Sequence, residues 1–136
     1  MTSLLETKNL RFEHLPERKA ILATATGTFI PRAEFTEAFE TLLSKLAEAP
    51  NADTLIFDKR PLRTFDQDSM VWYHVDWKER AYRNGIVHHI KLLPTDKTFR
   101  KSVEIGRQKI MDEHPDFDFA RYDIRYLDSI EEALPG

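Results

Sequence analysis

The sequence predicts an α/β fold in which a four- or five-stranded mixed, mostly parallel sheet is flanked by helices and begins with a β-hairpin. Short apolar runs typical of strands alternate with segments of helical periodicity, and only a turn separates the first two runs. The length of 136 residues, with 41% hydrophobic and 32% charged residues, fits a single domain over residues 1–136.

The N-terminal part is predicted to form two antiparallel strands and a helix. Leu10–His14 alternates between apolar and polar residues, the turn Leu15–Lys19 follows, and Ala20–Thr26 is a short apolar run. Pro31 suits the first turn of a helix, which stops before Pro50. The apolar face of this helix is formed by residues at helical spacing: Phe35, Phe39, Leu42 and Leu46.

The middle of the chain is predicted to alternate between strands and a long helix. Thr54–Asp58 is apolar enough to be a strand buried on both faces, and Ile86–Leu92 reads as the next strand. Between them, Asp66 is a plausible cap for a helix that continues to about Arg83 and ends at Asn84-Gly85. We expect these two strands to be parallel and central, because crossover helices normally join parallel neighbours.

The C-terminal part completes the pattern with a helix, a strand and a short helix. Pro94-Thr95-Asp96 opens the third helix, which His114-Pro115 ends. Residues 120–126 alternate as a fifth strand, and Ser129 caps a helix from Ile130 to Leu134 with Glu132 at the capping-box position. The inward face of the third helix is predicted from its spacing: Phe99, Val103, Gly106 and Ile110.

This element order and the closing segment resemble the STAS-like superfamily. Residues 122–134, Tyr-Asp-Ile-Arg-Tyr-Leu-Asp-Ser-Ile-Glu-Glu-Ala-Leu, are similar to the end of its SpoIIAA-like branch, where a strand runs into a short helix carrying Glu-Glu-Ala. The superfamily includes anti-sigma-factor antagonists, and some SpoIIAA-like proteins resemble lipid-binding CRAL-TRIO domains. The resemblance therefore implies a regulatory or protein-interaction module and not an enzyme.

The antagonists carry a phosphorylated serine in an Asp-Ser-Ser-Gly-Leu-like signature at the start of their second helix. In this chain Ser69 lies at about that position, preceded by Asp68. Met70 replaces the glycine and Val71 the leucine, so we expect no regulatory phosphorylation of Ser69.

Polar residues gather where the third and fourth strands end, which is where open α/β sheets usually bind ligands. The loop after the third strand brings Lys59 and five candidate ligand or partner residues: Asp58, Arg60, Arg63, Asp66 and Ser69. Asp96 comes from the next loop. The alternative is that Asp66 and Asp96 only cap helices while Lys59, Arg60 and Arg63 face solvent.

The second helix is the other candidate surface, because six of the eight residues from Met70 to Trp77 are large and apolar. If Met70 packs on the sheet, an α-helix turns Trp72 nearly to the opposite side. Trp72, Tyr73 and Trp77 would then contact a protein partner, a second copy in a homodimer, or an apolar small molecule or lipid in a pocket. The alternative is that they are core residues, since the helical spacing predicts an inner face formed by Met70, Tyr73, Trp77 and Ala81.

Several functions are not expected. There are no cysteines, the four glycines form no phosphate-binding motif, and no nucleophile–base spacing is recognisable, so we expect no catalytic centre and no cofactor. His88 and His89 point to opposite faces of a strand, which disfavours a metal site. Nine Lys and Arg stand against three acids between Lys78 and Lys109, but the net charge of −3 argues against nucleic-acid binding. No membrane span or signal peptide is recognisable, and we expect a cytoplasmic protein.

Overall fold

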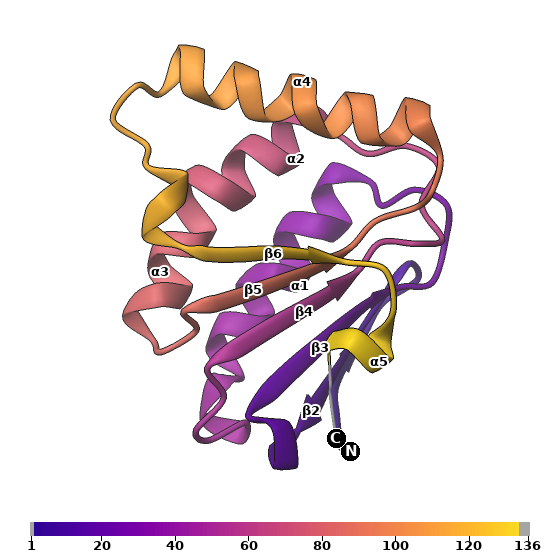
Figure 1. The fold of residues 1–136 in the computed structure, drawn as a ribbon. Helices are drawn as coiled ribbons and strands as arrows, with labels where there is room; N and C mark the ends of the chain where they lie inside the picture. Colours follow the sequence, from indigo (N-terminus) through magenta and orange to yellow (C-terminus); the bar gives the residue numbers. More distant parts are fainter. Residues whose placement is uncertain (1, 134–136) are drawn as a thin grey trace.

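A six-stranded sheet lies at the centre of the computed structural model, which describes residues 2–133 (Figure 1). The strands follow chain order across the sheet: β1 (Thr2–Glu6), β2 (Leu10–Leu15), β3 (Ala20–Ala25), β4 (Thr54–Asp58), β5 (His88–Leu92) and β6 (Asp123–Leu127). Strand β2 is antiparallel to both β1 and β3, and β3 to β6 are parallel to one another. The α/β class, the opening hairpin and the interior, parallel placement of β4 and β5 are confirmed.

The predicted strand number of four or five is corrected to six by β1. This strand pairs with β2 at the edge of the sheet, and its register shifts between Ser3 and Leu5. Leu4 is its only buried residue. A short edge strand with one buried side chain and a bulge has too little alternation to be recognised from sequence.

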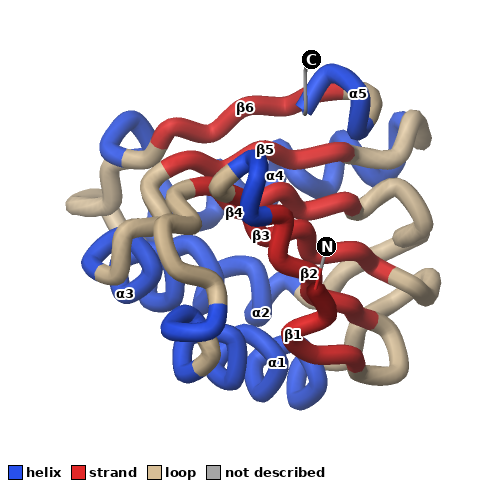
Figure 2. Tube along the Cα trace, turned by 90° about the horizontal axis from the view of Figure 1, so that it is seen from below, coloured by secondary structure: helices blue, strands red, loops and turns tan. Residues whose placement is uncertain are grey.

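The helices lie mainly on one face of the sheet. They are α1 (Arg32–Ser44), α2 (Gln67–Trp72), the π-helical η3 (Tyr73–Trp77), α3 (Lys78–Arg83), α4 (Lys97–Glu113) and α5 (Ile130–Ala133), with 3₁₀ turns η1 (Pro16–Arg18), η2 (Leu46–Glu48) and η4 (Phe119–Arg121). Figure 1 shows α1, α2 and α3 behind the sheet and α4 across the top of the view. Figure 2 shows α5 on the opposite side of the strands from α1. Right-handed crossovers between parallel strands in sequential order place their helices on one face.

Two predicted strand starts differ from the structure. Strand β5 begins at His88 rather than Ile86, and β6 begins at Asp123 because Ala120 belongs to η4. The C-terminal helix does follow Ser129, whose hydroxyl accepts a hydrogen bond from the Glu132 amide at 3.2 Å. Its predicted end at Leu134 lies outside the described residues.

The long helix predicted from Asp66 to Arg83 is present as α2, η3 and α3 in succession, and its centre is π-helical. Its buried positions recur every four residues: Ser69 and Met70, then Tyr73 and His74, then Trp77 and Lys78, then Ala81. In a regular α-helix this spacing would drift around the axis. Hydrogen bonding of the i→i+5 type widens the turn, and the widened turn keeps all these positions toward the sheet.

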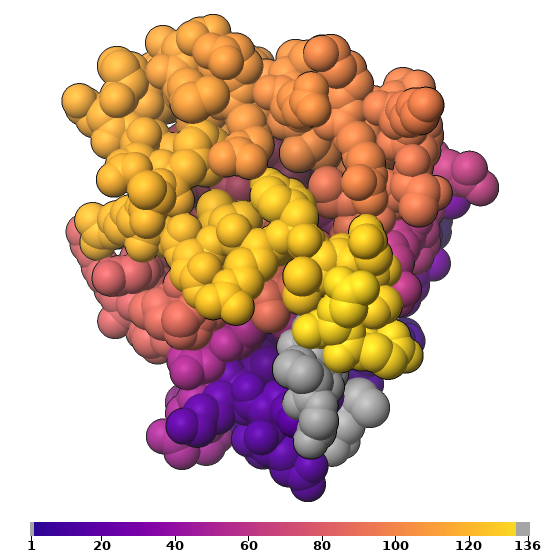
Figure 3. All heavy atoms as spheres, in the orientation of Figure 1, coloured from indigo at the N-terminus to yellow at the C-terminus, as the bar shows by residue number. Residues whose placement is uncertain are grey.

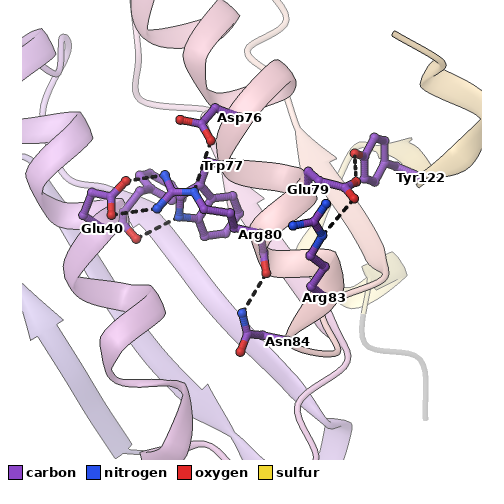
Figure 4. Close-up of polar contacts among 9 residues, drawn as sticks. Glu40, Asp76, Trp77, Glu79, Arg80, Arg83, Asn84 and Tyr122 are labelled. Atoms are coloured by element: carbon purple, nitrogen blue, oxygen red, sulfur yellow. Dashed lines mark hydrogen bonds and ion pairs between the residues drawn. The ribbon is translucent and has the colours of Figure 1, made fainter. Parts of the chain in front are cut away.

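The core between α1 and the sheet is largely aromatic. Phe39 lies at its centre, with ring centroids 5.1 Å from Phe12, 5.5 Å from Phe57 and 5.0 Å from Trp77. The indole N–H of Trp77 donates to the Phe39 carbonyl oxygen at 2.8 Å. In Figure 4, Arg80 reaches from α3 to Glu40 of α1, which ties the two helices together at the surface.

Candidate functional site

A small cavity lies between the inner face of the sheet, α2 with η3, and α4. Its free space is about 20 Å³, enough for an ordered water molecule. Beside the cavity, α4 approaches α2 closely at Gly106. A Cβ atom at this position would lie only 2.9 Å from Gln67 Oε1, so a larger residue would not fit without a shift. The residues that line the cavity mix apolar and cationic side chains: Lys59, Phe65, Met70, His74, Lys91, Leu93, Val103, Gly106, Arg107, Ile110 and Tyr126.

The cationic residues of this region are buried, which is rare for lysine. Lys59, Lys78 and Lys91 are 5%, 0% and 2% exposed, and His74 and His89 are also buried. We call these five residues the cationic cluster. Among residues 2–133, no carboxylate hydrogen-bonds or forms an ion pair with any of the three lysines.

The strands place three members of the cluster on the face that packs against the helices. Alternation along β5 turns His89 and Lys91 inward, and in the sheet register Lys91 lies beside Phe57, a core residue. The backbone N–H of Lys59 donates to the Leu92 carbonyl oxygen at 2.8 Å, which extends the β4–β5 pairing by one residue. Lys59 therefore points to the same face as Phe57, at the carboxyl end of the sheet.

The other two members come from the long helix. His74 and Lys78 are four residues apart, at positions that the π-helical turn keeps toward the sheet. Lys78 Nζ lies 5.3 Å from the centroid of the Tyr73 ring, and Lys91 Nζ lies 4.3 Å from the same centroid. The amines of both lysines thus lie against the phenol ring of Tyr73, and a cation–π interaction there would compensate only part of the desolvation of a protonated amine.

Most polar atoms of the cluster have no hydrogen-bond partner within the described chain. These atoms are Lys78 Nζ, Lys91 Nζ, His74 Nδ1 and both ring nitrogens of His89, together with the neighbouring Tyr73 hydroxyl. Lys59 Nζ has one weak partner, the Met70 sulfur at 3.6 Å. Such a concentration of buried donors is exceptional, because buried polar side chains in folded proteins are nearly always paired.

Burial lowers the pKa values throughout the cluster, since it penalises the charged forms. The pKa of Lys59 falls to about 8, and those of Lys78 and Lys91 fall well below the ordinary lysine value through burial and repulsion from neighbouring cations. Burial also lowers the pKa of His89 to about 2 and that of His74 well below its usual value. The histidines are therefore neutral, and the lysines lose protons far more easily than surface lysines do.

Arg107 and Tyr126 stand between the cavity and the surface. Arg107 Nη1 donates to the Tyr126 hydroxyl at 3.5 Å, and the guanidinium lies 4.7 Å from the Phe119 ring centroid. Both residues also line an open surface hollow of about 570 Å³ beside β6. Figure 3 shows α4 (orange) and the segment through β6 (yellow) next to each other on this face. A ligand reaching the cavity from this hollow would pass Arg107 and Tyr126.

The structure separates the residues predicted to form a site after β4. Asp58 is on the face opposite Lys59, where both of its oxygens accept hydrogen bonds from Arg60 at 2.9 and 2.8 Å. Arg63 is exposed and does not line the cavity. Of the predicted loop residues, only Lys59 lines the cavity.

Asp66 and Asp96 cap helices, as the alternative interpretation predicted, and Ser69 is the hydrogen-bond partner of Asp66. Asp66 accepts hydrogen bonds from the Ser69 amide at 2.9 Å and the Ser69 hydroxyl at 2.7 Å, and Asp96 caps α4 through the Thr98 amide at 2.9 Å. Ser69 is 1% exposed. Asp66 and Ser69 line a smaller apolar hollow next to the cavity.

The predicted aromatic surface on the second helix requires a correction. Tyr73 and Trp77 are 0% and 1% exposed, so both are core residues and neither forms an exposed partner surface. Trp72 is half-buried: it packs edge-on against Phe35 and lies 6.0 Å from the Arg80 guanidinium. Met70 and Trp72 both lie in the regular α-helix before η3, where a 100° step per residue turns Trp72 away from Met70, and its ring packs against Phe35 of α1. Self-association through Trp72 stays a prediction.

The remaining histidine prediction concerns His88, which faces away from His89 as expected for neighbours on a strand. His88 Nδ1 lies 2.7 Å from Asp123 Oδ2 on β6. Within residues 2–133, no group of three or more histidine or acidic residues is arranged to hold a metal ion. In the same part of the chain, no helix has the length and apolar character needed to cross a membrane.

Comparisons with protein-family models, curated proteins and solved structures found no match to this chain. The resemblance to the STAS-like superfamily therefore stays a prediction, as do the regulatory role and the cytoplasmic location derived with it.

The cationic cluster was not predicted from the sequence, although two signals were present. Lys91 and His89 alternate in a strand predicted to be central in a sheet flanked by helices, so one of its faces had to bury charge or imidazole. His74 and Lys78 stand one turn apart in a helix rich in core aromatics. Neither signal shows that the two segments meet, because that requires the tertiary packing of α2 and η3 on β5.

Proposed function

We propose that this protein binds a small organic acid, whose carboxylate is held by the cationic cluster and whose carbon skeleton lies in the cavity between the sheet, α2 and α4. The observation that carries the proposal is the burial of three lysines with no carboxylate paired to them among the described residues. A bound carboxylate would supply the missing negative charge and accept hydrogen bonds from the ammonium groups.

Energetics favour a ligand over a purely structural role for the cluster. An unpaired buried charge destabilises a folded protein by several kcal/mol, roughly, and an apolar side chain of the same size is often more stable. A cluster kept only for packing would therefore be inferior to leucine or methionine. Destabilised, strongly perturbed groups beside a cavity are typical of binding and catalytic sites.

The small cavity limits the ligand. With about 20 Å³ free, anything larger than water must displace wall side chains. Met70 and Arg107 are the flexible members of the wall, and both have several rotatable bonds. A short-chain acid suits this space, whereas a long-chain lipid would require α2 and α4 to separate.

Thermal denaturation with small acids tests the proposal. We expect lactate, at constant ionic strength, to raise Tm with a saturable concentration dependence, because it binds the folded state alone. Propionamide, which is similar in size but uncharged, should leave Tm unchanged.

A pair of variants localises the effect. Lys59→Met should raise the Tm of the free protein, because it removes a buried ammonium group with no carboxylate partner among residues 2–133, and should abolish the shift caused by lactate. Lys101→Met is the matched control, because the Lys101 side chain is 71% exposed, and it should respond as the unaltered protein does. Equal shifts with lactate and propionamide, or a full lactate shift in Lys59→Met, would contradict the proposal.

A further inference from the structure

The three buried lysines differ in what surrounds each amine. Lys78 does not line the cavity. Lys59 lines it, and its Nζ contacts the Met70 sulfur. Lys91 lines it as well, with its Nζ 4.3 Å from the Tyr73 ring centroid and 5.7 Å from that of Phe57, and without a hydrogen-bond partner in residues 2–133. Of the two lysine amines that line the cavity, that of Lys91 therefore has the fewer hydrogen-bond partners to stabilise its protonated form.

Lys91 and its neighbours differ in protonation state. Repulsion from Lys78 and Lys59 adds to burial in lowering the pKa of Lys91. Lys59, with a pKa of about 8, keeps its proton at neutral pH, and the Arg107 guanidinium lies at the rim of the cavity. A neutral amine beside fixed cations is the arrangement that makes a lysine nucleophilic toward carbonyl groups.

We infer that Lys91 forms a reversible imine with the carbonyl group of a small 2-oxo acid, whose carboxylate is held by Lys59 and Arg107. This inference rests on the proposed function, since it adds a covalent bond to the same ligand site. It also narrows the ligand class from small acids in general to those with a carbonyl carbon next to the carboxylate.

The reaction balances without an oxidant or reductant. The lone pair of the neutral Lys91 Nζ attacks the carbonyl carbon, the C=O π electrons pass to oxygen, and a proton moves from nitrogen to that oxygen to give a carbinolamine. The hydroxyl group then takes up a proton and leaves as water while the nitrogen releases its second proton, so one amine and one carbonyl give one imine and one water. His74 lines the same cavity with a neutral imidazole and is placed to carry these protons.

Reductive trapping tests the inference. The intact protein is incubated with pyruvate and sodium cyanoborohydride at neutral pH, and its mass is then measured. The expected product carries one pyruvic acid less one oxygen atom per chain, and peptide mapping should place it on Lys91. Lactate, which has no carbonyl group, should give no adduct.

Two variants complete the experiment. Lys91→Met should lose the adduct while remaining folded, as judged by circular dichroism, and Lys101→Met should retain it. Labelling that falls on surface lysines, or on Lys59, or that is equally strong in Lys91→Met, would overturn the inference. If lactate still raises Tm while pyruvate leaves no adduct on Lys91, the covalent step is wrong and the proposed binding function stands. If lactate has no effect on Tm, the binding function itself fails.

Discussion

Phe39 shows how much of the fold depends on a single residue. It is 0% exposed, and its ring contacts aromatic rings from β2, α1, β4 and the long helix. The same residue also accepts the Trp77 indole hydrogen bond through its carbonyl oxygen. Phe39 therefore contacts the sheet and the long helix at once, and these contacts hold α1 and η3 on the sheet.

Replacement of Phe39 by alanine should lower the free energy of unfolding by about 3–5 kcal/mol, the usual loss for a buried phenylalanine whose cavity cannot collapse. Urea denaturation measures the loss. Phe29→Ala is the matched control, because Phe29 is 39% exposed, and it should cost less than about 1 kcal/mol. Similar losses in the two variants would show that the aromatic centre of the core has been misassigned.

At the scale of elements, Asp66 joins two helices that are far apart in sequence. It caps α2 through Ser69, and its carboxylate receives two hydrogen bonds from Arg32 of α1, at 2.9 and 3.1 Å. The Arg32 hydrogen bond is the largest of the interactions that lower the pKa of Asp66, which falls from 3.8 to about 2. The carboxylate form is therefore favoured in the folded state.

Asp66→Ala should lower stability by about 0.5–2 kcal/mol, the range for loss of an N-cap. Asp66→Asn should lose less stability near neutral pH, because asparagine caps a helix almost as well as aspartate. This variant also removes the part of the pH dependence of stability that comes from the Asp66 carboxylate. Since folding lowers this pKa, its contribution is present above pH 3.8 and is lost as the pH falls through about 2. Urea denaturation from about pH 5 to about pH 2 should show a smaller loss for Asp66→Asn than for the unaltered protein.

Asp96→Asn provides the control for the acid effect. Asp96 also caps a helix, but within residues 2–133 no arginine pairs with it. The acid loss of this variant should follow that of the unaltered protein. An equal reduction in both variants would assign the effect to capping and not to Arg32.

The sequence was sufficient to predict elements whose evidence is local. The Asp66 and Asp96 caps, the apolar face of α1 and the buried strands β4 and β5 all follow from composition and spacing within a few residues. The cationic cluster was out of reach because it depends on non-local events. Lys91 from β5 meets Tyr73 from the long helix only through tertiary packing, and propensity does not reveal the π-helical turn that keeps His74 and Lys78 toward the sheet.

At the scale of the whole molecule, the cationic cluster makes stability depend on pH in an unusual direction. Most proteins are most stable between about pH 5 and 8. Here the folded state lowers the pKa values of three lysines, so it binds fewer protons than the unfolded chain over the range between the folded and ordinary values. Unfolding then takes up protons, and stability rises as pH increases through that range.

For Lys59 this range runs from about pH 8 to 10.5, with its stabilisation complete above 10.5 and lost as the pH falls through about 8. Each lysine that is neutral when folded adds up to about 1.4 kcal/mol of stability per pH unit. The rise should end near pH 10, because burial raises the pKa of Tyr73, and the unfolded chain then ionises its tyrosine first.

Urea denaturation at several pH values between about 8 and 10 should therefore show stability increasing with pH. Lys91→Met should have a shallower slope, while Lys101→Met should keep the full slope. Saturating lactate should also flatten the slope, because a bound carboxylate favours the protonated lysines. A flat profile in the unaltered protein would mean that the lysines stay charged when buried, and that the cluster is paired in solution by something other than this chain.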